Sequence, residues 1–369
     1  MSSDASKNKL RGELSSALLK KAAYNLGFSH VGIAPAESVP NEVINHYEQW
    51  LRNGCHGDMQ YLEKYLDVRR DPRLLLPGAK TVVSLALSYN PGDSPTQPSI
   101  AWYAQGRDYH DVAREKLRLL AQKTLVPALP HNVEGVKAAG EDNQSPSPLL
   151  GRDLGRGSST VSYHICVDTA PILEKYWAWR CGLGWIGRHT QLVIPHEGSA
   201  FFLCELLLTL EADEYDEPMS PLTPLTPLSP LSSHFSPLTP HPCGSCHRCV
   251  DACPTGAISA DGLDARRCLS YLTIEHRGPL PPSAIQHLKP CFYGCDRCLR
   301  ACPHLSREAT SVDDFHPSPE LLAMTGSDWS SLTPEQYREL FRASAVKRAK
   351  YDGLMRNISA CGVDDFRTS

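Results

Sequence analysis

The sequence predicts an α+β protein with a mixed sheet domain over about residues 10–210, a small cysteine-rich domain and a short helical tail. Apolar residues recur at helical spacing near residues 14–26, whereas residues 81–89 form a β-branched run bounded by Pro-Gly pairs. Cysteines concentrate at residues 243–302, after a proline repeat that separates them from the sheet domain. Helices and strands thus alternate in the first part only.

The elements of the sheet domain can be placed in chain order. Amphipathic spacing predicts helices at residues 11–30, 41–53 and 110–127, and we expect the last to end before Pro127. Short apolar and β-branched runs predict strands at residues 31–34, 81–89, 161–167, 191–195 and 201–210. The predicted domain boundaries are 1–212, 213–242, 243–310 and 311–369.

Two segments look like insertions. Residues 131–160 are rich in Gly, Ser, Asp and Glu, and residues 217–242 carry a three-residue repeat with proline at every third place. Such a repeat excludes helix and central strand and favours polyproline II. We interpret it as a semi-rigid linker rather than as a ligand for an SH3-type domain.

The cysteine spacing predicts two [4Fe–4S] clusters. The run that starts at Cys243 is C-x₂-C-x₂-C-x₃-C-P, the bacterial ferredoxin pattern, and a second run ending at Cys302 lacks only its first cysteine. Disulfides would need an oxidising compartment, and zinc sites do not call for this spacing. Because the fourth cysteine of each run serves the other cluster, cluster one is predicted at Cys243, Cys246, Cys249 and Cys302, and cluster two at Cys253, Cys268, Cys295 and Cys298. Cys291 competes with Cys268 for the eighth place, but its spacing to Cys295 is one residue too long.

Composition narrows the class of protein. The net charge of -4 gives no general attraction to nucleic acid, so any such contact needs a local basic face. No apolar run approaches the roughly 18 residues that span a bilayer. Reduced thiolates without an export signal or a membrane span predict a cytoplasmic protein.

Three segments of the sheet domain could hold the chemistry that the clusters feed. No G-x-G-x-x-G follows a strand, which disfavours a dinucleotide site. The candidates are residues 103–110, residues 167–171 with Asp168 after a predicted strand, and the glycine-rich residues 182–190. Asp168 is open to a structural interpretation as well, as the cap of a helix that starts at Pro171.

The tail begins with a capped helix at Thr333-Pro and carries a basic face. Its basic residues are Arg338, Arg342, Lys347, Arg348 and Lys350. A solvated helix face explains them as well as a binding surface does.

Taken with the cysteines, these segments resemble the epoxyqueuosine reductases, the cobalamin- and iron–sulfur-dependent family of queuosine synthesis in tRNA. The resemblance is collinear, covers most of the chain and lapses in the two insertions. The matching stretches are residues 75–80, 106–110, 167–174, 182–187, 198–203, 253–258, 264–275, 293–298 and 344–350.

The resemblance implies a nitroreductase-like sheet domain that holds cobalamin, base-off, near cluster two of a ferredoxin-like domain. It implies two-electron reduction of epoxyqueuosine at the tRNA wobble position to queuosine, with Asp168 as proton donor. Because burial under the corrin would raise the pKa of Asp168, we expect this carboxyl to hold a proton near neutral pH. The cobalamin contacts implied by the motifs are Arg69, Ala101, Asp168, His189, Leu192, Leu203, Ser270 and Asp296.

The resemblance also implies partners. Basic residues of the tail, with Arg266 or Arg267, would contact tRNA phosphates, and an external one-electron donor of flavodoxin or ferredoxin type would reduce the clusters. The chain departs from the family where Arg188 replaces the usual Lys. It also stops at Ser369, so the tail is expected to be a truncated start of a HEAT-like region. The alternatives are a cytoplasmic enzyme of reductive dehalogenase type and a ferredoxin-type electron carrier. A carrier has no use for a large sheet domain, and the dehalogenases carry an export signal that is absent here.

Overall fold

The computed structural model describes residues 13–93, 99–128, 136–138, 161–219, 242–259 and 262–362. Most of the two predicted insertions, at 131–160 and 217–242, lies outside the described residues, as do the last seven residues of the tail. Within the described residues, no helix combines the length and the apolar character that crossing a bilayer requires.

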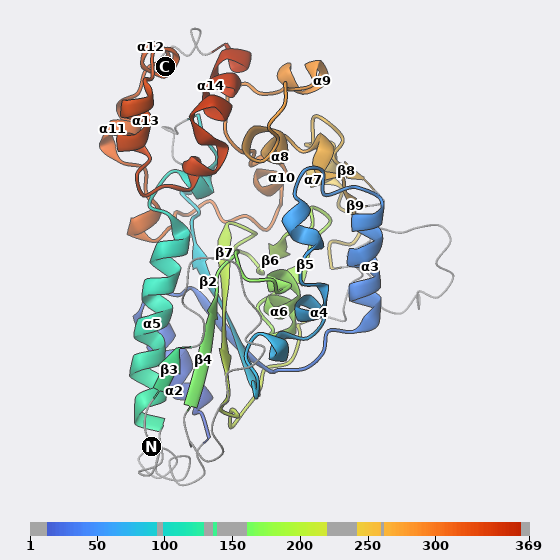
Figure 1. Ribbon diagram of the computed structural model, residues 1–369, viewed down its shortest axis with the longest axis vertical. Coiled ribbons are helices and arrows are strands. Elements are labelled where there is room, and N and C mark those ends of the chain that lie inside the picture. The colour runs from blue at the N-terminus through green and yellow to red at the C-terminus, as the bar shows by residue number, and fades with distance from the viewer. Residues whose placement is uncertain are drawn as a thin grey trace.

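A five-stranded sheet forms the centre of the first domain (Figure 1). Its order is β1-β2-β7-β4-β3, and every pair is antiparallel except β3 with β4. The strands are β1 (His30–Pro35), β2 (Thr81–Ser88), β3 (Val136–Ala138), β4 (Val161–Cys166) and β7 (Phe201–Leu208). All eight residues of β2 are buried, because β2 is central and both faces of the sheet are covered.

Helices cover the two faces of the sheet. α2 (Ser16–Asn25) and α5 (Tyr109–Ala128) pack on one face, and α3 (Asn41–Arg52) and α6 (Glu174–Arg180) pack on the other (Figure 1). The residues of β2 alternate between these layers, with Leu85 among the α2 and α5 side chains and Ala86 among those of α6. This two-residue period of a strand divides the domain into two cores.

Most predicted elements of the sheet domain are confirmed, with three differences. The first helix ends at Asn25, because the chain turns at Gly27 (φ 86°) and enters β1 at His30. α5 continues through Pro127, which lies in the last turn, where the missing N–H costs one hydrogen bond without ending the helix. The strand expected at 191–195 is only β6 (Leu192–Val193), which pairs with β5 (Trp185–Ile186) outside the main sheet.

Short elements surround the cysteines and build the tail. The cysteine-rich region has α7 (Arg248–Asp251), β8 (Ile258–Ser259), β9 (Gly262–Leu263), η4 (Ala265–Arg267), α8 (Leu269–Ile274), α9 (Pro282–Ile285) and α10 (Arg297–Arg300). The tail has η5 (Asp313–Phe315), α11 (Pro319–Ala323), α12 (Gly326–Ser330), α13 (Pro334–Leu340), η6 (Ala345–Ala349) and α14 (Lys350–Cys361). Linking the sheet domain to both are η1 (Gln60–Glu63), α4 (Leu66–Arg70), η2 (Pro72–Leu74) and η3 (Trp102–Ala104).

The tail and the cysteine-rich region share one hydrophobic core. Trp329 of α12 packs edge-on against Phe292 with ring centroids 4.8 Å apart, and Leu354 of α14 is fully buried in the same cluster. The predicted cap at Thr333 is confirmed: its side chain accepts from the Gln336 amide, and the Gln336 side chain accepts in return from the Thr333 amide. The tail helices therefore rest against the cysteine-rich region.

Candidate active site and cluster sites

Asp168 lies just after β4, in a left-handed backbone conformation with φ 53°. Its amide donates to Glu174 Oε1 at 2.5 Å, and its carboxylate accepts from the Tyr109 hydroxyl at 2.8 Å. His110 Nε2 lies 3.3 Å from the same carboxylate oxygen. Asp168 caps no helix, because α6 starts at Glu174 with Leu173 at its N-cap. The capping interpretation of Asp168 is therefore wrong.

His110 comes from the first turn of α5 and lies between two carboxylates. Its Nδ1 is 2.7 Å from Asp108 Oδ1, and its ring stacks on Tyr109 with centroids 4.0 Å apart. Burial lowers the pKa of His110, but the hydrogen bonds with Asp108 and Asp168 outweigh burial and raise the pKa to about 9. His110 is therefore a cation at neutral pH.

This imidazolium corrects the expectation of a raised pKa at Asp168. Burial acts to raise the pKa of Asp168, but the hydrogen bond and charge of His110 and the hydrogen bond from Tyr109 outweigh it and lower the pKa. The Asp168 side chain keeps 58% of its surface exposed, so its carboxylate stays accessible to a substrate. Residues 110 and 168 are far apart in the chain, so their contact could not be read from local sequence pattern.

Two further carboxyls lie behind Asp168. Burial and then the charge of Asp168 raise the pKa of Glu174 to about 8. Glu205 on β7 has no exposed surface and accepts a hydrogen bond from Ser84 Oγ of β2 at 3.0 Å. Burial and the charge of Glu174 raise the pKa of Glu205 far above its usual range. These carboxyls are therefore neutral at neutral pH and leave Asp168 as the charged member.

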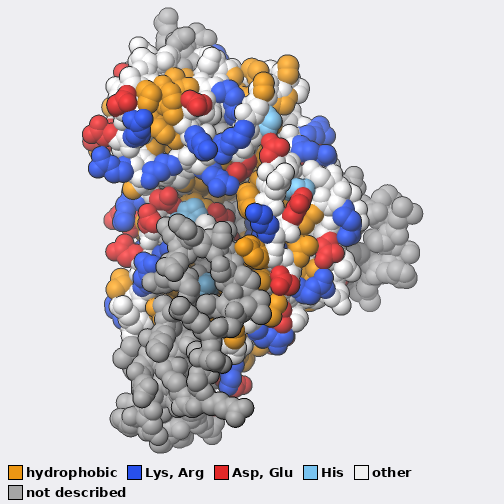
Figure 2. Space-filling view, in the orientation of Figure 1, with side chains coloured by type: hydrophobic (Ala, Val, Ile, Leu, Met, Phe, Trp, Pro, Cys, Tyr) orange, Lys and Arg blue, Asp and Glu red, His pale blue; other side chains and the backbone are white. Residues whose placement is uncertain are grey.

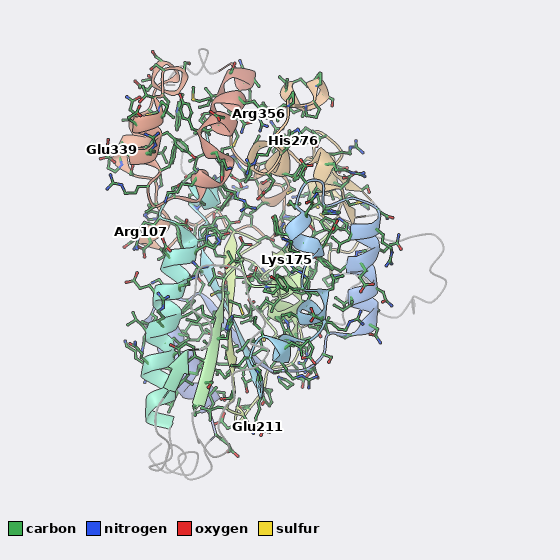
Figure 3. All side chains as sticks on the ribbon, viewed as in Figure 1. Arg107, Lys175, Glu211, His276, Glu339 and Arg356 are labelled. Atoms are coloured by element: carbon green, nitrogen blue, oxygen red, sulfur yellow. The ribbon has the colours of Figure 1, made fainter. Side chains whose placement is uncertain are left out.

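Lys175 of α6 is influenced electrostatically by this cluster of carboxyl groups and by a cysteine of the second run. Figure 3 labels Lys175 near the centre of the molecule, between the sheet domain and the cysteine-rich region. Burial lowers the pKa of Lys175, and Glu174, Asp168 and Cys298 act in the opposite direction. Lys175 therefore responds electrostatically both to the Asp168 site and to the second cysteine run. Glu174 was within reach of sequence reasoning as the last residue of a matching stretch, whereas Lys175 follows that stretch and was missed.

The eight residues implied as cobalamin contacts are partly brought together. The Trp102 amide, next to Ala101, donates to Asp296 Oδ2 at 2.8 Å. Leu192 and Leu203 pack in one core cluster. Burial, and then the charge of Lys175, lower the pKa of His189 to about 4, so this buried imidazole is neutral. No hydrogen bond or ion pair among the described residues joins Arg69 or Ser270 to the other six.

The Arg69 guanidinium has a buried N–H donor without a hydrogen-bond partner. Arg69 is 8% exposed, its guanidinium lies 5.5 Å from the centroid of the Tyr47 ring, and the unpaired donor is its Nε. Asp296, another of the eight implied contacts, is also buried: burial raises its pKa to about 6, although the Trp102 amide and the charge of Arg300 act to lower that pKa. A buried unpaired donor is costly unless a ligand satisfies it. Arg69 therefore fits a bound group that offers acceptors.

The cysteines of the two runs influence one another electrostatically. Burial and then the charges of Cys243 and Cys302 raise the pKa of Cys249 to about 11. Burial raises the pKa of Cys302 as well, and the Cys243 and Cys246 charges add to it. For Cys298 the neighbours that raise the pKa, after burial, are Cys295, Cys268, Cys249 and Cys253, which come from both predicted sets. Among the described residues no three or more Cys, His, Asp or Glu side chains are arranged to hold a metal ion, so the division into two sets of four stays a prediction of the spacing.

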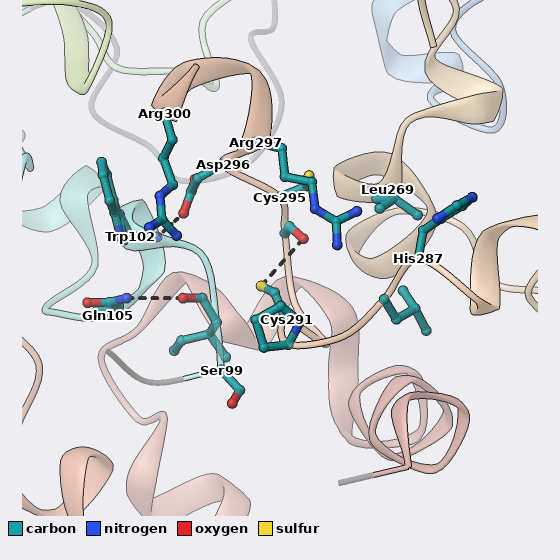
Figure 4. Close-up of a pocket in the computed structure, with 14 residues that line it drawn as sticks. Ser99, Trp102, Gln105, Leu269, His287, Cys291, Cys295, Asp296, Arg297 and Arg300 are labelled. Atoms are coloured by element: carbon teal, nitrogen blue, oxygen red, sulfur yellow. Dashed lines mark hydrogen bonds between the residues drawn. The ribbon is translucent and has the colours of Figure 1, made fainter. Parts of the chain in front are cut away.

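Cys291 lies beside these groups but is engaged elsewhere. Its thiol donates to the Tyr293 carbonyl at 3.1 Å, and burial raises its pKa. Figure 4 shows it in a pocket of about 150 Å³ that Cys295, Asp296 and Arg297 also line. The charge of Cys253, by contrast, acts on the Cys268 thiol. Main-chain carbonyls thus accept from Cys291, and Cys268 as the eighth ligand stays a prediction.

Ferredoxin-spaced cysteines, in a chain that also holds the carboxylate–imidazole pair of Asp168 and His110, define an iron–sulfur oxidoreductase. A family model described as 4Fe-4S double cluster binding domain matches residues 242–304, and one described as Epoxyqueuosine reductase QueG, DUF1730 matches residues 69–137. The epoxyqueuosine reductase of Cellulophaga algicola is 35% identical over 94% of this chain and 97% of its own length. That of Pseudomonas aeruginosa is 32% identical over 92% of this chain and 83% of its own length. The chain belongs to the epoxyqueuosine reductase family.

Solved structures show the same fold. The structure of epoxyqueuosine reductase from Streptococcus thermophilus is 27% identical with a TM-score of 0.69, covering 94% of this chain and 80% of that one. An epoxyqueuosine reductase with an epoxyqueuosine-modified tRNA-Tyr stem loop is 23% identical with a TM-score of 0.71 and the same coverage. The resemblance found in the sequence is confirmed at the level of family and fold.

Proposed function

We propose that the chain reduces the epoxide of epoxyqueuosine, at the wobble position of a tRNA anticodon, to the alkene of queuosine. The observation that carries the proposal is the Asp168 carboxylate, which accepts a hydrogen bond from Tyr109 and lies 3.3 Å from Nε2 of His110. The reaction consumes two electrons and two protons, breaks both C–O bonds of the epoxide and releases water. The site must therefore deliver protons as well as electrons.

Two [4Fe–4S] clusters would supply electrons one at a time. The first would be held by Cys243, Cys246, Cys249 and Cys302, and the second by Cys253, Cys268, Cys295 and Cys298. The C-x₂-C-x₂-C-x₃-C-P spacing supports that division. At Cys253, the Ala257 amide donates to the sulfur at 3.2 Å, the kind of contact that tunes a cluster thiolate.

Cobalamin would lie between the sheet and the second cluster, in a nitroreductase-like domain. Its reduced cobalt would supply the nucleophile or electron donor that opens the epoxide. The unpaired Nε of Arg69 fits the acceptor groups of a corrin, and Ala101, His189, Leu192, Leu203, Ser270 and Asp296 would complete the contacts. The close approach of Gly294 to Ala101, where an added Cβ would lie 2.4 Å from the Ala101 Cβ, keeps side chains small at that place.

The proton donor in this proposal is the pair His110 and Asp168, which shares one proton. Asp108 accepts from Nδ1 and so directs Nε2 of His110 at the Asp168 carboxylate. When a bound substrate excludes water, the proton on Nε2 moves to the Asp168 oxygen, from which it reaches the leaving alkoxide. Solvent then returns a proton to the pair, which delivers it to the hydroxyl so that the oxygen leaves as water. Glu174 holds the Asp168 amide and thereby keeps the left-handed turn in place.

A basic strip on the tail would hold the tRNA. It comprises the exposed residues Arg338, Arg342, Lys347, Arg348 and Lys350. Figure 2 shows Lys and Arg side chains gathered over the tail region on the drawn face. Arg266 and Arg267 of η4 are exposed too and could reach further phosphates. A soluble one-electron donor of flavodoxin or ferredoxin type would reduce the clusters, and free tRNA and reduced thiolates are consistent with a cytoplasmic location.

The test is single-turnover reduction of epoxyqueuosine-containing tRNA by anaerobic protein loaded with both cofactors, followed by nucleoside analysis. Wild-type protein should convert epoxyqueuosine to queuosine. Asp168→Asn should lower the rate by about 100-fold or more, since general acid catalysis is worth about 10²–10⁴-fold. The iron content and the corrin absorption of the variant should equal those of the wild type. An active Asp168→Asn enzyme would exclude the proposed proton donor, and wild-type protein without any turnover would exclude the function.

A further inference from the structure

An exposed aromatic side chain, Tyr61, lies where three parts of the chain meet. Tyr61 belongs to η1, Glu275 follows α8, and Arg348 belongs to η6. The Arg348 guanidinium carbon lies 5.3 Å from the centroid of the Tyr61 ring, and Nε and Nη2 donate to the two Glu275 carboxylate oxygens at 2.8 and 3.0 Å. Tyr61 nevertheless keeps 45% of its surface exposed. A planar aromatic–guanidinium surface thus faces solvent.

The segment that carries Tyr61 is anchored on both sides. The Tyr47 hydroxyl donates to the Leu62 carbonyl at 2.7 Å, and the Asp58 amide donates to the Tyr271 hydroxyl at 2.7 Å. His276 forms a further contact of 3.0 Å with Asp58. The hydrogen bonds at Leu62 and Asp58 therefore hold the backbone on both sides of the exposed Tyr61 ring. Such a ring can accept a partner at small cost in conformational entropy.

Arg348 is anchored as well. Arg277 donates to the Arg348 carbonyl at 2.9 Å and to the Ala349 carbonyl at 3.2 Å, which fastens η6 to the end of α8. The bidentate pair with Glu275 fixes the plane of the guanidinium group. Both planar groups of the surface therefore have a defined orientation before any ligand arrives.

The charge of Asp168 acts on this surface: after burial and Glu275, it also contributes to the raised pKa of Tyr61, about 12. Among the described residues, left-handed backbone at non-glycine residues occurs at Tyr65, Asp168, Thr190, His196 and Lys350. Tyr65 (φ 57°) and Lys350 (φ 61°) follow Glu63 and Arg348 by two residues, so the chain turns sharply just after each of the two segments that carry the planar groups.

We infer that Tyr61, together with Arg348, is a stacking platform for the unpaired base of a nucleotide adjacent to the modified one in the anticodon loop. Unpaired RNA bases stack on Tyr rings and Arg planes, while Lys and Arg take the phosphates. Lys347 and Lys350, exposed on either side of Arg348, supply those charges. The inference rests on the proposed function and assigns to the same site a subsite for the neighbouring base.

The test is a double-mutant cycle between protein and RNA. Binding of labelled anticodon stem loops to the cofactor-loaded protein is measured with Tyr61 or Tyr61→Ala. The stem loops are intact, or abasic at the nucleotide on the 5′ or the 3′ side of the wobble position. Stacking predicts that Tyr61→Ala weakens binding of the intact loop by about 5- to 150-fold. Removing the stacked base should remove the effect of the substitution, so one of the two abasic loops should bind wild-type protein and Tyr61→Ala with equal affinity.

Two controls and three outcomes complete the test. Tyr61→Trp should retain binding, and Tyr24→Ala, which removes a ring of 51% exposure on α2, should leave it unchanged. An effect of Tyr61→Ala that persists with both abasic loops overturns the platform, and so does unchanged binding of the intact loop. If the wild-type protein binds no stem loop at all, the proposed function fails instead, which is a distinguishable result.

Discussion

Replacing Asp108 by Asn tests the idea that His110 stores the proton used at Asp168. The pKa of His110 is about 9 against the ordinary value of 6.5, a rise of about 2.5 that corresponds to about 3.4 kcal/mol. Only 22% of the His110 side chain is exposed, so solvent screens the two carboxylates weakly. Asp108, at 2.7 Å, makes the shorter of the two contacts, and a hydrogen bond to a charged group contributes about 1.5–3 kcal/mol. Removing its charge should lower the pKa of His110 by about 1–2.

The assay is the pH dependence of single-turnover epoxide reduction. His110 carries the transferable proton only below its folded pKa, so the rate is full at low pH and falls as pH rises through that value. The alkaline limb should lie near pH 9 in the wild type and between about pH 7 and 8 in Asp108→Asn. Asp111→Asn, an exposed carboxylate in the same turn of α5, is the matched control. Coinciding alkaline limbs in Asp108→Asn and wild type would refute the proton-storage argument.

Two further predictions concern the clusters and the tail. Cys268→Ser should disrupt the second cluster and lower the iron content toward half. Cys291→Ser should leave the iron content unchanged, because the Cys291 thiol donates to a main-chain carbonyl. Iron analysis and electron paramagnetic resonance test both variants, and the reverse pattern would make Cys291 the ligand in place of Cys268. Leu354→Ala should destabilise the core shared by the tail and the cysteine-rich region by about 2–5 kcal/mol in urea unfolding. Leu322→Ala, at a position with 41% exposure, should change the free energy of unfolding by about 0.5 kcal/mol or less. An equal loss of unfolding free energy in the two variants would contradict the shared core.

Local pattern and spacing predicted much of this protein. Ferredoxin spacing predicted two sets of cluster ligands because the peptide between neighbouring ligands leaves little freedom in how they meet. Strand β2 was evident from its β-branched run, and the cap at Thr333 from its neighbours, because both depend on contacts within a few residues. The family itself followed from collinear short motifs.

Tertiary structure decided the chemistry of the site. His110 and Asp168 are 58 residues apart in sequence, and only the packing of α5 along the sheet brings an imidazolium to the carboxylate. That contact reversed the expected direction of the pKa shift at Asp168. The platform at Tyr61 likewise combines residues from three parts of the chain. By itself the sequence determined which groups the protein has and how neighbouring ones are spaced. The charge state of each buried group was decided by the fold, because Coulomb energies and desolvation depend on distances through space rather than along the chain.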